Sequence, residues 1–535
     1  MDKIFRVIGP PGCGKTTNLT RQIDAAAKKY GPNGVVVASF TKTAAQELAS
    51  RNPLITGVGT MHSHAFHAIG HRRVAEEMAA EFSAAYPRYK MSGSKASAVD
   101  VGFDAAPQKA SGDALLAQLN ILRAKMVPHE MWPANLRAFD AAWLKFKYEN
   151  DAVDFTDMLE IALRDTSHAP GDPAVFMVDE YQDSSPLMHA LATKWARRCD
   201  SFVVSGDADQ AIFTFAGSDP AVMMGEVDKE IVLSQSYRCS QAVHAYARRW
   251  VKQIKGRTDY EYHPTTQEGF VRHAPYTLKM HRELVDDVEK YTAAGKSVMI
   301  LASCSYMLSP IISEMRERGL LFHNPWRPSN GAWNPVRLVE DDSDTITTLD
   351  KVLAFLAPSP DVWGDAHHLW TADEFAAWAA MIRSDCGINK GMKKALADIG
   401  GPERVDMTFF ADFFCEQASF WEMFSRFEKS EAIKWFRESL TASASKAAHY
   451  PIKVVERYNT SIEPKISIGT IHSVKGAEAD VVIVAPDLSY SGVQEAMGRQ
   501  TQRDGVYRLF YVALTRAREG VVLCGQTGNN AIRWL

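Results

Sequence analysis

The residues best suited to chemistry lie near the start of the chain, where residues 9–16 read Gly-Pro-Pro-Gly-Cys-Gly-Lys-Thr. This segment fits the pattern G-x4-G-K-[ST] and directly follows a short apolar run that is typical of a strand. Glycines let the backbone approach phosphate oxygens closely, so that its N–H groups and the next helix N-terminus point at the anion. We therefore predict a nucleotide-binding loop formed by Gly9, Pro10, Pro11, Gly12, Cys13, Gly14, Lys15, Thr16 and Thr17.

Charged and hydroxyl side chains give this loop its expected chemistry. Lys15 supplies a positive charge for the β- and γ-phosphates, and the Thr16 hydroxyl is a ligand for Mg²⁺. Asp179 and Glu180 follow the apolar run 175–178, where we expect Asp179 to hold Mg²⁺ through water and Glu180 to orient or deprotonate the attacking water. Acidic residues after strands also serve as caps, and only the pairing with the loop favours the catalytic interpretation. ATP and Mg²⁺ are the predicted ligands.

A third strand, at 202–204, leads into Gly206-Asp207-Ala208-Asp209-Gln210. Gln210 is placed to contact the γ-phosphate or its attacking water. By itself a Gly-Asp-x-Asp segment indicates only a turn.

Two groups of apolar runs must position these residues. The first group is 6–8, 35–38, 175–178 and 202–204, and the second is 298–301, 465–468, 481–484 and 521–523. Each run ends at a turn and is followed by helical spacing, which is typical of parallel strands in α/β folds. Between them lie helical, Ala-rich residues 68–150 and helical, aromatic-rich residues 355–455. We interpret Trp363, Trp370, Trp378, Trp421 and Trp435 in the latter mainly as core residues.

Composition limits the class of protein. The chain has 535 residues, a formal charge of -4 and 46% apolar residues, so we expect about three to four domains. This charge excludes an indiscriminate polycation but allows a local basic groove for nucleic acid. No run approaches the roughly 20 apolar residues of a membrane span. The seven cysteines contain no CxxC pair, which favours a cytoplasmic, soluble protein without a disulfide framework or zinc site.

The order of these and further segments resembles the superfamily-1 helicases of the UvrD/Rep/PcrA type. The resemblance covers almost the whole chain, apart from the two helical insertions. It is carried by the segments 9–17, 38–48, 59–63, 154–158, 179–183, 206–217, 235–240, 469–478 and 509–518.

The resemblance implies a fold of two RecA-like parallel-sheet P-loop domains, each with a mainly helical insertion. Its implied boundaries place the first domain at 1–67 and 151–228, with its insertion at 68–150. They place the second domain at 229–354 and 456–535, with a reduced insertion at 355–455.

The resemblance also assigns further residues to an ATP cleft between the two domains. Arg238 and Arg516 are expected as arginine fingers that stabilise charge on the γ-phosphoryl. Tyr237 is expected to stack near the adenine, and Gly476 and Glu478 to line the cleft. Gln210 is expected to couple hydrolysis to the DNA groove.

The same resemblance implies a track for single-stranded DNA and duplex junctions, with movement from 3′ to 5′. Aromatic rings stack on bases with little sequence preference, which suits a motor on DNA. The residues expected along this track are Phe40, Thr41, Thr60, His62, Phe213, Phe215 and His472. We expect a monomer or weak self-association, without a membrane partner, and leave open a protein loading partner. The alternatives are a translocase that displaces proteins with little unwinding and a P-loop phosphotransferase, with a nucleic-acid scaffold as a more distant option.

Several positions depart from the family. Because few residues precede Gly9, we expect the glutamine-bearing motif for adenine to be missing, and adenine selectivity stays open. Thr17, Ala216 and Ala479 replace residues that the family commonly carries, namely arginine at the first two positions and an aromatic at the third. From the short segment after Arg518 we expect no appended nuclease domain.

Overall fold

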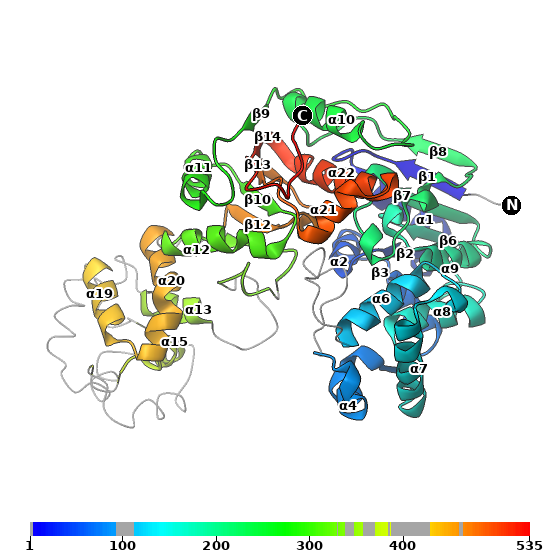
Figure 1. Cartoon of the computed structure of the whole chain (residues 1–535), viewed down its shortest axis with the longest axis horizontal. Coiled ribbons are helices and arrows are strands. Elements are labelled where there is room, and N and C mark those ends of the chain that lie inside the picture. The colour runs from blue at the N-terminus through cyan, green and yellow to red at the C-terminus, as the bar shows by residue number, and fades with distance from the viewer. Residues whose placement is uncertain are drawn as a thin grey trace. The chain divides into compact units, whose positions relative to one another are not determined.

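The protein is described here from a computed structural model, which covers residues 4–92, 112–328, 330–336, 347–356, 370–383, 386, 429–458 and 464–535 (Figure 1). Contacts between Cα atoms divide the chain into two compact units. The first unit comprises Met1–Met280, Ala294–Leu308 and Gly469–Leu535, and the second comprises His281–Ala293 and Ser309–Ile468. All the candidate site residues predicted from the sequence belong to the first unit.

The first sheet has six strands in the order β3-β2-β6-β7-β1-β8. All of its neighbouring strands are parallel. The strands are β1 (Ile4–Ile8), β2 (Val35–Ser39), β3 (Val58–Thr60), β6 (Val175–Val178), β7 (Ser201–Gly206) and β8 (Lys229–Val232). The four strands predicted for this sheet are thereby confirmed. Strand β8 lies just beyond residue 228, where we place the end of the first domain, and it pairs with β1.

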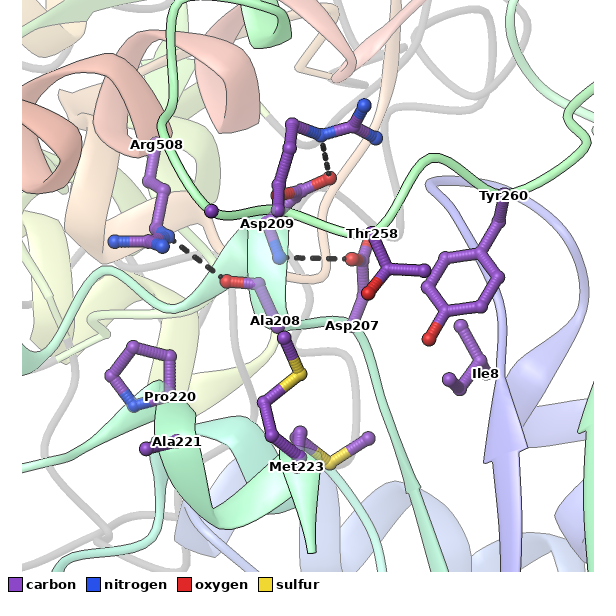
Figure 2. A pocket seen from close by; sticks show the side chains of 13 residues that line it. Ile8, Asp207, Ala208, Asp209, Pro220, Ala221, Met223, Thr258, Tyr260 and Arg508 are labelled. Atoms are coloured by element: carbon purple, nitrogen blue, oxygen red, sulfur yellow. Dashed lines mark hydrogen bonds and ion pairs between the residues drawn. The ribbon is translucent and has the colours of Figure 1, made fainter.

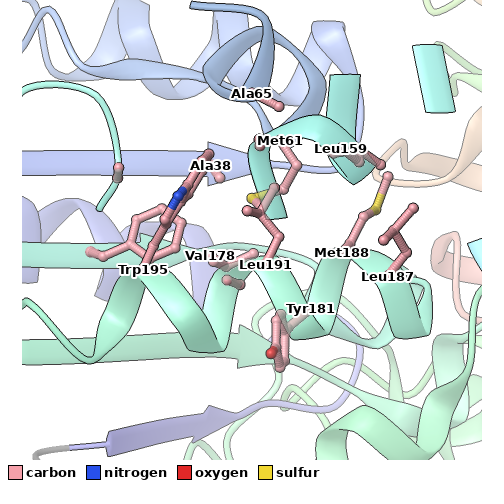
Figure 3. Close-up of a cluster of buried hydrophobic side chains, with 14 of the residues drawn as sticks. Ala38, Met61, Ala65, Leu159, Val178, Tyr181, Leu187, Met188, Leu191 and Trp195 are labelled. Carbon is pink, nitrogen blue, oxygen red and sulfur yellow. The ribbon is translucent and has the colours of Figure 1, made fainter. Parts of the chain in front are cut away.

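Helices cover both faces of this sheet. Successive residues of a strand point to opposite faces, and here the side chains on both faces are apolar. In β2, Val36 and Ala38 join one buried cluster, whereas Val35 and Val37 join the other. Figure 3 shows the first cluster, where Met61, Leu191 and Trp195 pack over the sheet. The helices are α1 (Lys15–Tyr30), α2 (Lys42–Arg51), α3 (Met61–Ala68), α8 (Phe155–Asp165) and α9 (Pro186–Ala196).

A helical segment between β3 and α8 has a core of its own. Phe82, Phe139, Trp143 and Phe146 form its centre, and each is at most 4% exposed. The elements are β4 (Arg73–Val74), α4 (Ala79–Ala85), α6 (Gly112–Ala124), α7 (Ala134–Glu149) and β5 (Ala152–Val153). Residues 93–111 lie outside the described residues.

Charged side chains from this helical segment form a buried ion cluster with the N-terminus of α8. The Asp154 carboxylate, fully buried, accepts hydrogen bonds from Arg123 at 2.8 Å, Lys147 at 2.6 Å and Trp143 Nε1 at 2.9 Å. Asp157 also contacts Arg123 and Lys147, each at 2.6 Å. Burial opposes the charge of Asp154, but Arg123 and Lys147 outweigh it and hold the pKa of Asp154 well below its usual range. The cluster fixes where α8 begins.

The second sheet also has six strands, in the order β11-β12-β10-β13-β14-β9. The chain therefore has the predicted α/β fold with two parallel sheets. The strands are β9 (Phe270–His273), β10 (Val298–Ala302), β11 (Phe322–His323), β12 (Ile466–Thr470), β13 (Ala479–Val484) and β14 (Ala517–Leu523). Four of them, β10, β12, β13 and β14, were predicted as apolar runs and are confirmed. Within the first unit, helix α10 (Gln241–Val251) and helix α22 (Gln500–Leu514) pack against β14, and α21 (Tyr490–Met497) packs against α22.

The second unit is mostly helical. Its helices are α11 (His281–Ala293), α12 (Ser309–Glu317), α13 (Thr348–Leu356), α15 (Ala372–Ala379), α19 (Lys429–Ser439) and α20 (Ala442–Tyr458). Trp370 and Trp378 are fully buried beside Phe355, which confirms the prediction that they are core residues. Trp435 lies against Phe355 and is partly buried, while Trp363 and Trp421 lie outside the described residues. Across the described ranges, no helix is long and apolar enough to cross a bilayer.

Candidate functional site

The predicted phosphate loop lies between β1 and α1, at the carboxyl edge of the first sheet. Gly12 and Gly14 adopt φ angles of 75° and 74°, which a residue with a side chain rarely takes. A Cβ atom at Gly12 would also lie 2.5 Å from Cβ of Arg238, so the close approach of that residue requires glycine. No side chain caps the N-terminus of α1. Its N–H groups therefore stay available to an anion.

The other residues of the loop differ in exposure. Lys15 folds back over the loop, and its Nζ donates to the Gly9 carbonyl at 2.6 Å. Thr16 is partly buried and Thr17 is exposed, whereas Pro10 and Pro11 are buried. Cys13 is buried as well, and burial raises the pKa of its thiol to about 12. Cys13 is therefore neutral, and the cationic group of the loop is Lys15.

The two predicted carboxylates directly follow β6. Burial, together with the charge of Glu180, raises the pKa of Asp179 to about 7. Burial acts on Glu180 in the same direction, but the positive charges of Lys475 and Lys15 outweigh it and lower the pKa of Glu180. Glu180 therefore stays an ionised base at neutral pH.

The backbone at Glu180 is unusual, with a φ angle of 51° in the left-handed region. Non-glycine residues rarely occupy this region, and such strain is frequent at functional sites. The side-chain amide of Gln182 donates to the Glu180 carboxylate. Lys475 contacts it at 3.7 Å and also donates to Asp183. The strained turn and these partners hold the carboxylate in one place.

Arg516 reaches Gln210 from the end of α22. Its Nη2 donates to Gln210 Oε1 at 3.1 Å, and Gln210 Nε2 donates in turn to Asp207 at 2.7 Å. The Arg516 guanidinium is only 2% exposed, and burial, followed by the charge of Arg238, lowers its pKa to about 9. Residues 306 positions apart in the sequence thus meet in one hydrogen-bonded chain.

Arg238 and Glu478 form an ion pair, with Arg238 Nε donating to Glu478 at 2.7 Å. Burial opposes the charge of Glu478, but Arg238 and then Arg518 outweigh it and lower its pKa. Tyr237 donates its backbone N–H to the Gly12 carbonyl at 2.9 Å, while its side chain is 77% exposed beside Gly14. The exposed ring is thus open to a planar partner.

Gly476 adopts a φ angle of 90° between these groups. No atom lies within 4 Å of the place where its Cβ would be. Glycine is therefore required there by the backbone conformation and not by crowding.

Some contact residues of this site were not predicted from the sequence. Ser236 and Tyr262 both donate side-chain hydroxyls to the Pro11 carbonyl, at 3.2 and 2.8 Å. Lys475 joins Asp183 and Glu180, as described above. Lys475 and Asp183 lie inside segments that carried the family resemblance, which is the signal that would have found them. Tyr262 lies outside every such segment, and no motif points to it.

Four of the residues predicted to bind DNA form an aromatic group. The ring centroids of Phe40 and Phe213 are 5.1 Å apart and those of Phe215 and His472 are 5.0 Å apart. Phe213 also contacts Phe215 and His472, and it is 1% exposed, so its ring is enclosed by its neighbours. Phe40 and Phe215 are partly exposed. In this structure they, and not Phe213, present ring surface on which a base can stack.

The other three predicted DNA residues lie at helix starts. Thr41 and Thr60 accept hydrogen bonds from backbone N–H groups and cap α2 and α3. A capping hydroxyl still has its own O–H group to donate. His62 lies edge-on to Phe155, with ring centroids 6.1 Å apart. Its burial lowers the pKa of His62 to about 4, so the imidazole is neutral.

A cavity of about 190 Å³ borders the segment that leads to Gln210 (Figure 2). Its wall includes Ile8, which directly precedes the phosphate loop, together with Asp207 and Asp209. Arg508 of α22 faces the same cavity, and its Nε donates to the Ala208 carbonyl at 3.0 Å. Burial, followed by the charge of Asp207, raises the pKa of Asp209 to about 6. The end of β1, the residues that precede Gln210 and Arg508 of α22 thus line one cavity.

The donor set suits Mg²⁺ in one particular way. Among the described residues, no group of three or more His, Cys, Asp and Glu side chains is arranged to hold a metal ion. Mg²⁺ is usually held by one or two protein oxygens together with substrate phosphates, and not by an all-protein cage. The hydroxyl of Thr16 and the buried carboxylate of Asp179 provide such oxygens. These residues therefore fit a Mg²⁺ ion that arrives with a nucleotide.

Comparison with protein families gives two matches. Residues 1–216 match the AAA domain family, and residues 419–525 match the UvrD-like helicase C-terminal domain family. The first match contains the phosphate loop, Asp179 and Gln210, and the second contains His472, Glu478 and Arg516. The two halves of the predicted site therefore fall into two separately recognised families.

Curated proteins give a similar result. The chain is 25% identical over 290 residues to the ATP-dependent DNA helicase UvrD2 of Mycobacterium tuberculosis, which covers 47% of this chain and 41% of the relative. It is 25% identical over 289 residues to the ATP-dependent DNA helicase PcrA of Bacillus subtilis, with 48% and 39% covered. The chain thus spans about two fifths of the length of these relatives.

Proposed function

We propose that this chain, which belongs to the UvrD/PcrA type of superfamily-1 helicases, is an ATP-dependent DNA helicase that moves from 3′ to 5′ on single-stranded DNA. The observation that carries the proposal is the hydrogen bond between Arg516 and Gln210, at 3.1 Å. It brings a buried cation from one half of the site to Gln210, which also donates to Asp207 at the end of β7, the strand that pairs with β1. Such a link is what an ATPase that couples nucleotide state to another ligand requires.

The nucleotide would be held mainly by the first sheet. The N–H groups of the loop and the Lys15 ammonium would bind the β- and γ-phosphates once Lys15 leaves the Gly9 carbonyl. Thr16 and Asp179 would hold Mg²⁺, which when bound neutralises phosphate charge. The exposed ring of Tyr237 would pack against the base, and Gly476 and Glu478 would line the same cleft.

Hydrolysis would begin at Glu180. Its carboxylate is ionised and fixed by Gln182 and Lys475, so it would orient the attacking water and accept its proton. Arg516 and Arg238 would stabilise the negative charge that spreads over the γ-phosphoryl oxygens. Arg238 would first have to exchange Glu478 for the phosphate. Both arginines are therefore expected to act on the rate of hydrolysis more than on nucleotide affinity.

Gln210 would report the state of the phosphate to the DNA side. The residues after it, Phe213 and Phe215, join Phe40 and His472 in the aromatic group. Partly exposed Phe40 and Phe215 would stack on bases, with enclosed Phe213 following only when its neighbours move. Opening and closing of the cleft with each ATP would then move the contacts of the aromatic group along the DNA strand. The hydroxyls of Thr41 and Thr60 and the ring of His62 would contact the same strand.

The first experiment measures ATP turnover with and without single-stranded DNA. We expect strong stimulation in the wild type, and Lys15→Ala should abolish turnover while leaving DNA binding intact. Substantial turnover in Lys15→Ala would contradict the assignment of the site. Phosphate transfer to a metabolite without any need for DNA would identify a phosphotransferase instead.

A second measurement separates unwinding from movement. Duplexes with a single-stranded tail at either end should be unwound only when the tail allows 3′ to 5′ movement. Translocation without strand separation would identify a motor that displaces proteins from single strands.

Two further expectations have their own tests. Sedimentation velocity of the protein tests our expectation of a monomer or weak self-association. Fractionation of cells tests the expected cytoplasmic location.

A further inference from the structure

A second, much smaller cavity lies where β2 and β6 end. Its volume is about 10 Å³, which is close to that of one water molecule measured in the same way. The residues that supply polar groups to its wall are Ser39, His62, Asp179 and Ser184. Met61 and Met188 are among the residues that close it, and both also belong to the apolar cluster of Figure 3.

Two buried oxygen atoms of this wall have no hydrogen-bond partner within the described parts of the chain. They are Oγ of Ser39, a residue 1% exposed, and Oδ1 of Asp179, a residue 4% exposed. A buried polar group without a partner is unfavourable, and ordered water commonly satisfies such groups. A buried water needs a polar site with two to four partners, and this cavity offers them.

The chemistry of the wall also sets the direction of each hydrogen bond. A carboxylate oxygen only accepts, so a partner of Asp179 Oδ1 must donate. The Ser39 hydroxyl both donates and accepts, and a water molecule can join the two groups. The ring of His62, neutral as described above, presents one donor and one acceptor nitrogen.

We propose that the cavity holds one ordered water, which accepts the Ser39 O–H group and donates to Asp179 Oδ1, and that this water links the nucleotide site to the DNA-contacting segments. The second part of the proposal rests on the proposed function. Ser39 is then a positioning residue, because it acts through the water and touches neither nucleotide nor DNA.

The position of Ser39 makes this link direct. Phe40 follows it and stacks on Phe213, and Thr41 follows Phe40 and caps α2. Asp179 is the residue that we expect to hold Mg²⁺ on the nucleotide side. A change in the position of its carboxylate would therefore reach the strand end that carries Phe40 through a single water. The backbone hydrogen bond from Asp179 N to Ala38 O, at 2.9 Å, joins the same strands but does not involve the carboxylate.

A crystal structure that resolves ordered waters tests the first part. We expect a water within about 3.2 Å of both Ser39 Oγ and Asp179 Oδ1. A dry cavity, or a direct hydrogen bond between the two side chains, would overturn the proposal. This outcome does not depend on any activity of the protein.

Substitution tests the second part, with a matched control. Ser39→Ala removes one anchor of the water, and we expect the stimulation of ATPase by single-stranded DNA to fall roughly fivefold or more, within the usual range of coupling between sites. Ser205 of β7 is also buried and also interacts with the Asp179 carboxylate, but it does not line the cavity, so its loss leaves the water in place. Ser205→Ala should therefore change the stimulation less than about twofold.

The possible results separate the two levels of the proposal. An equal fall in both variants would show that any lost hydroxyl near Asp179 suffices, which contradicts the link. Full stimulation in Ser39→Ala would contradict it too, whereas absence of stimulation in the wild type would contradict the proposed function instead. Melting curves should show both variants folded, and if Ser39→Ala does not fold, the crystallographic water decides.

Discussion

Two clusters of buried charge occur in the first unit, and they differ in how fully their charges are paired. In the cluster at the start of α8, Asp154 accepts hydrogen bonds from Arg123, Lys147 and Trp143. The pKa values of its central groups move toward the charged forms: carboxylates raise the pKa of Arg123 despite its burial, and its cations lower that of Asp154 despite its burial. Two carboxylates at its edge depart from this. Burial and then the charge of Asp154 raise the pKa of Glu76 to about 8, and burial also raises the pKa of Asp140.

At the nucleotide site the pKa values divide into two sets. Burial opposes the charges of Glu180 and Glu478, but nearby cations outweigh it and lower their pKa values, whereas those of Asp179 and Arg516 move toward the neutral forms. Burial raises the pKa of Asp179 to about 7 and lowers that of Arg516 to about 9. One oxygen of Asp179 and one of Asp183 have no partner among the described residues. Strongly shifted pKa values of this kind are typical of groups whose charged forms are stabilised only when a ligand binds. An ion cluster whose charges are already paired has a structural role. The first cluster is thus expected to govern stability and the second to govern activity.

The largest expected effect is on turnover. Arg516→Ala should lower kcat by roughly a thousandfold or more, as for other arginine fingers. Its effect on the free energy of unfolding should be small, because the arginine that it removes is itself unfavourably buried. Steady-state ATPase and denaturant unfolding of the same samples measure the two quantities. A modest fall in kcat would indicate that Arg516 has a structural role and not a catalytic one.

The next effect has the opposite character. Asp154→Asn leaves Arg123 and Lys147 buried without their main partner, and we expect a loss of about 3–5 kcal/mol in the free energy of unfolding. The kcat of the folded enzyme should stay near that of the wild type. Glu160→Gln is the control, since this partner of Arg123 is 41% exposed and should contribute less than about 1 kcal/mol. A large loss of kcat at unchanged stability would contradict our expectation that the Asp154 cluster governs stability and not activity.

Asp179→Asn should change stability in the opposite direction from Asp154→Asn. The pKa of Asp179 is raised in the folded state, so between its unfolded value and about 7 the folded protein binds more protons, and stability falls as pH rises. At pH 8 the variant should therefore gain about 1–3 kcal/mol, somewhat less than the pKa shift alone implies. It should also lose this part of the pH dependence and its ATPase. The lowered pKa of Asp154 gives stability that is lost only at strongly acidic pH.

The smallest effect lies outside both clusters. Phe215→Ala should weaken binding to single-stranded DNA by about 1–3 kcal/mol, the usual range for a stacking ring. Stability and basal ATPase should stay close to wild type. Tyr148→Ala is the control, because Tyr148 on α7 is 90% exposed and distant in sequence from every predicted DNA residue. Equal losses in both variants, measured by fluorescence anisotropy, would place the DNA elsewhere.

Much of this arrangement is predictable from local patterns. The phosphate loop has a fixed spacing of glycines around Lys15, and buried parallel strands such as β2 and β6 are short apolar runs. Strand β8 is partly exposed and carries Lys229 and Glu230, so it has no such run and its pairing with β1 depends on the fold. Tyr262 could not be predicted for the same reason, because its contact with Pro11 spans 251 positions. The enclosure of Phe213 likewise follows from neighbours that lie far apart in the sequence.

Burial of Cys13 has a consequence for redox chemistry. A thiol two positions before the phosphate-binding lysine would, as a thiolate, react readily with oxidants and alkylating reagents. With a pKa of about 12 and 5% exposure, this sulfur is almost entirely protonated at neutral pH and has little access to solvent. The loop should therefore tolerate peroxide and maleimide reagents while its fold is intact. Modification of Cys13 would instead measure how often local unfolding of the surrounding strand ends exposes its thiol.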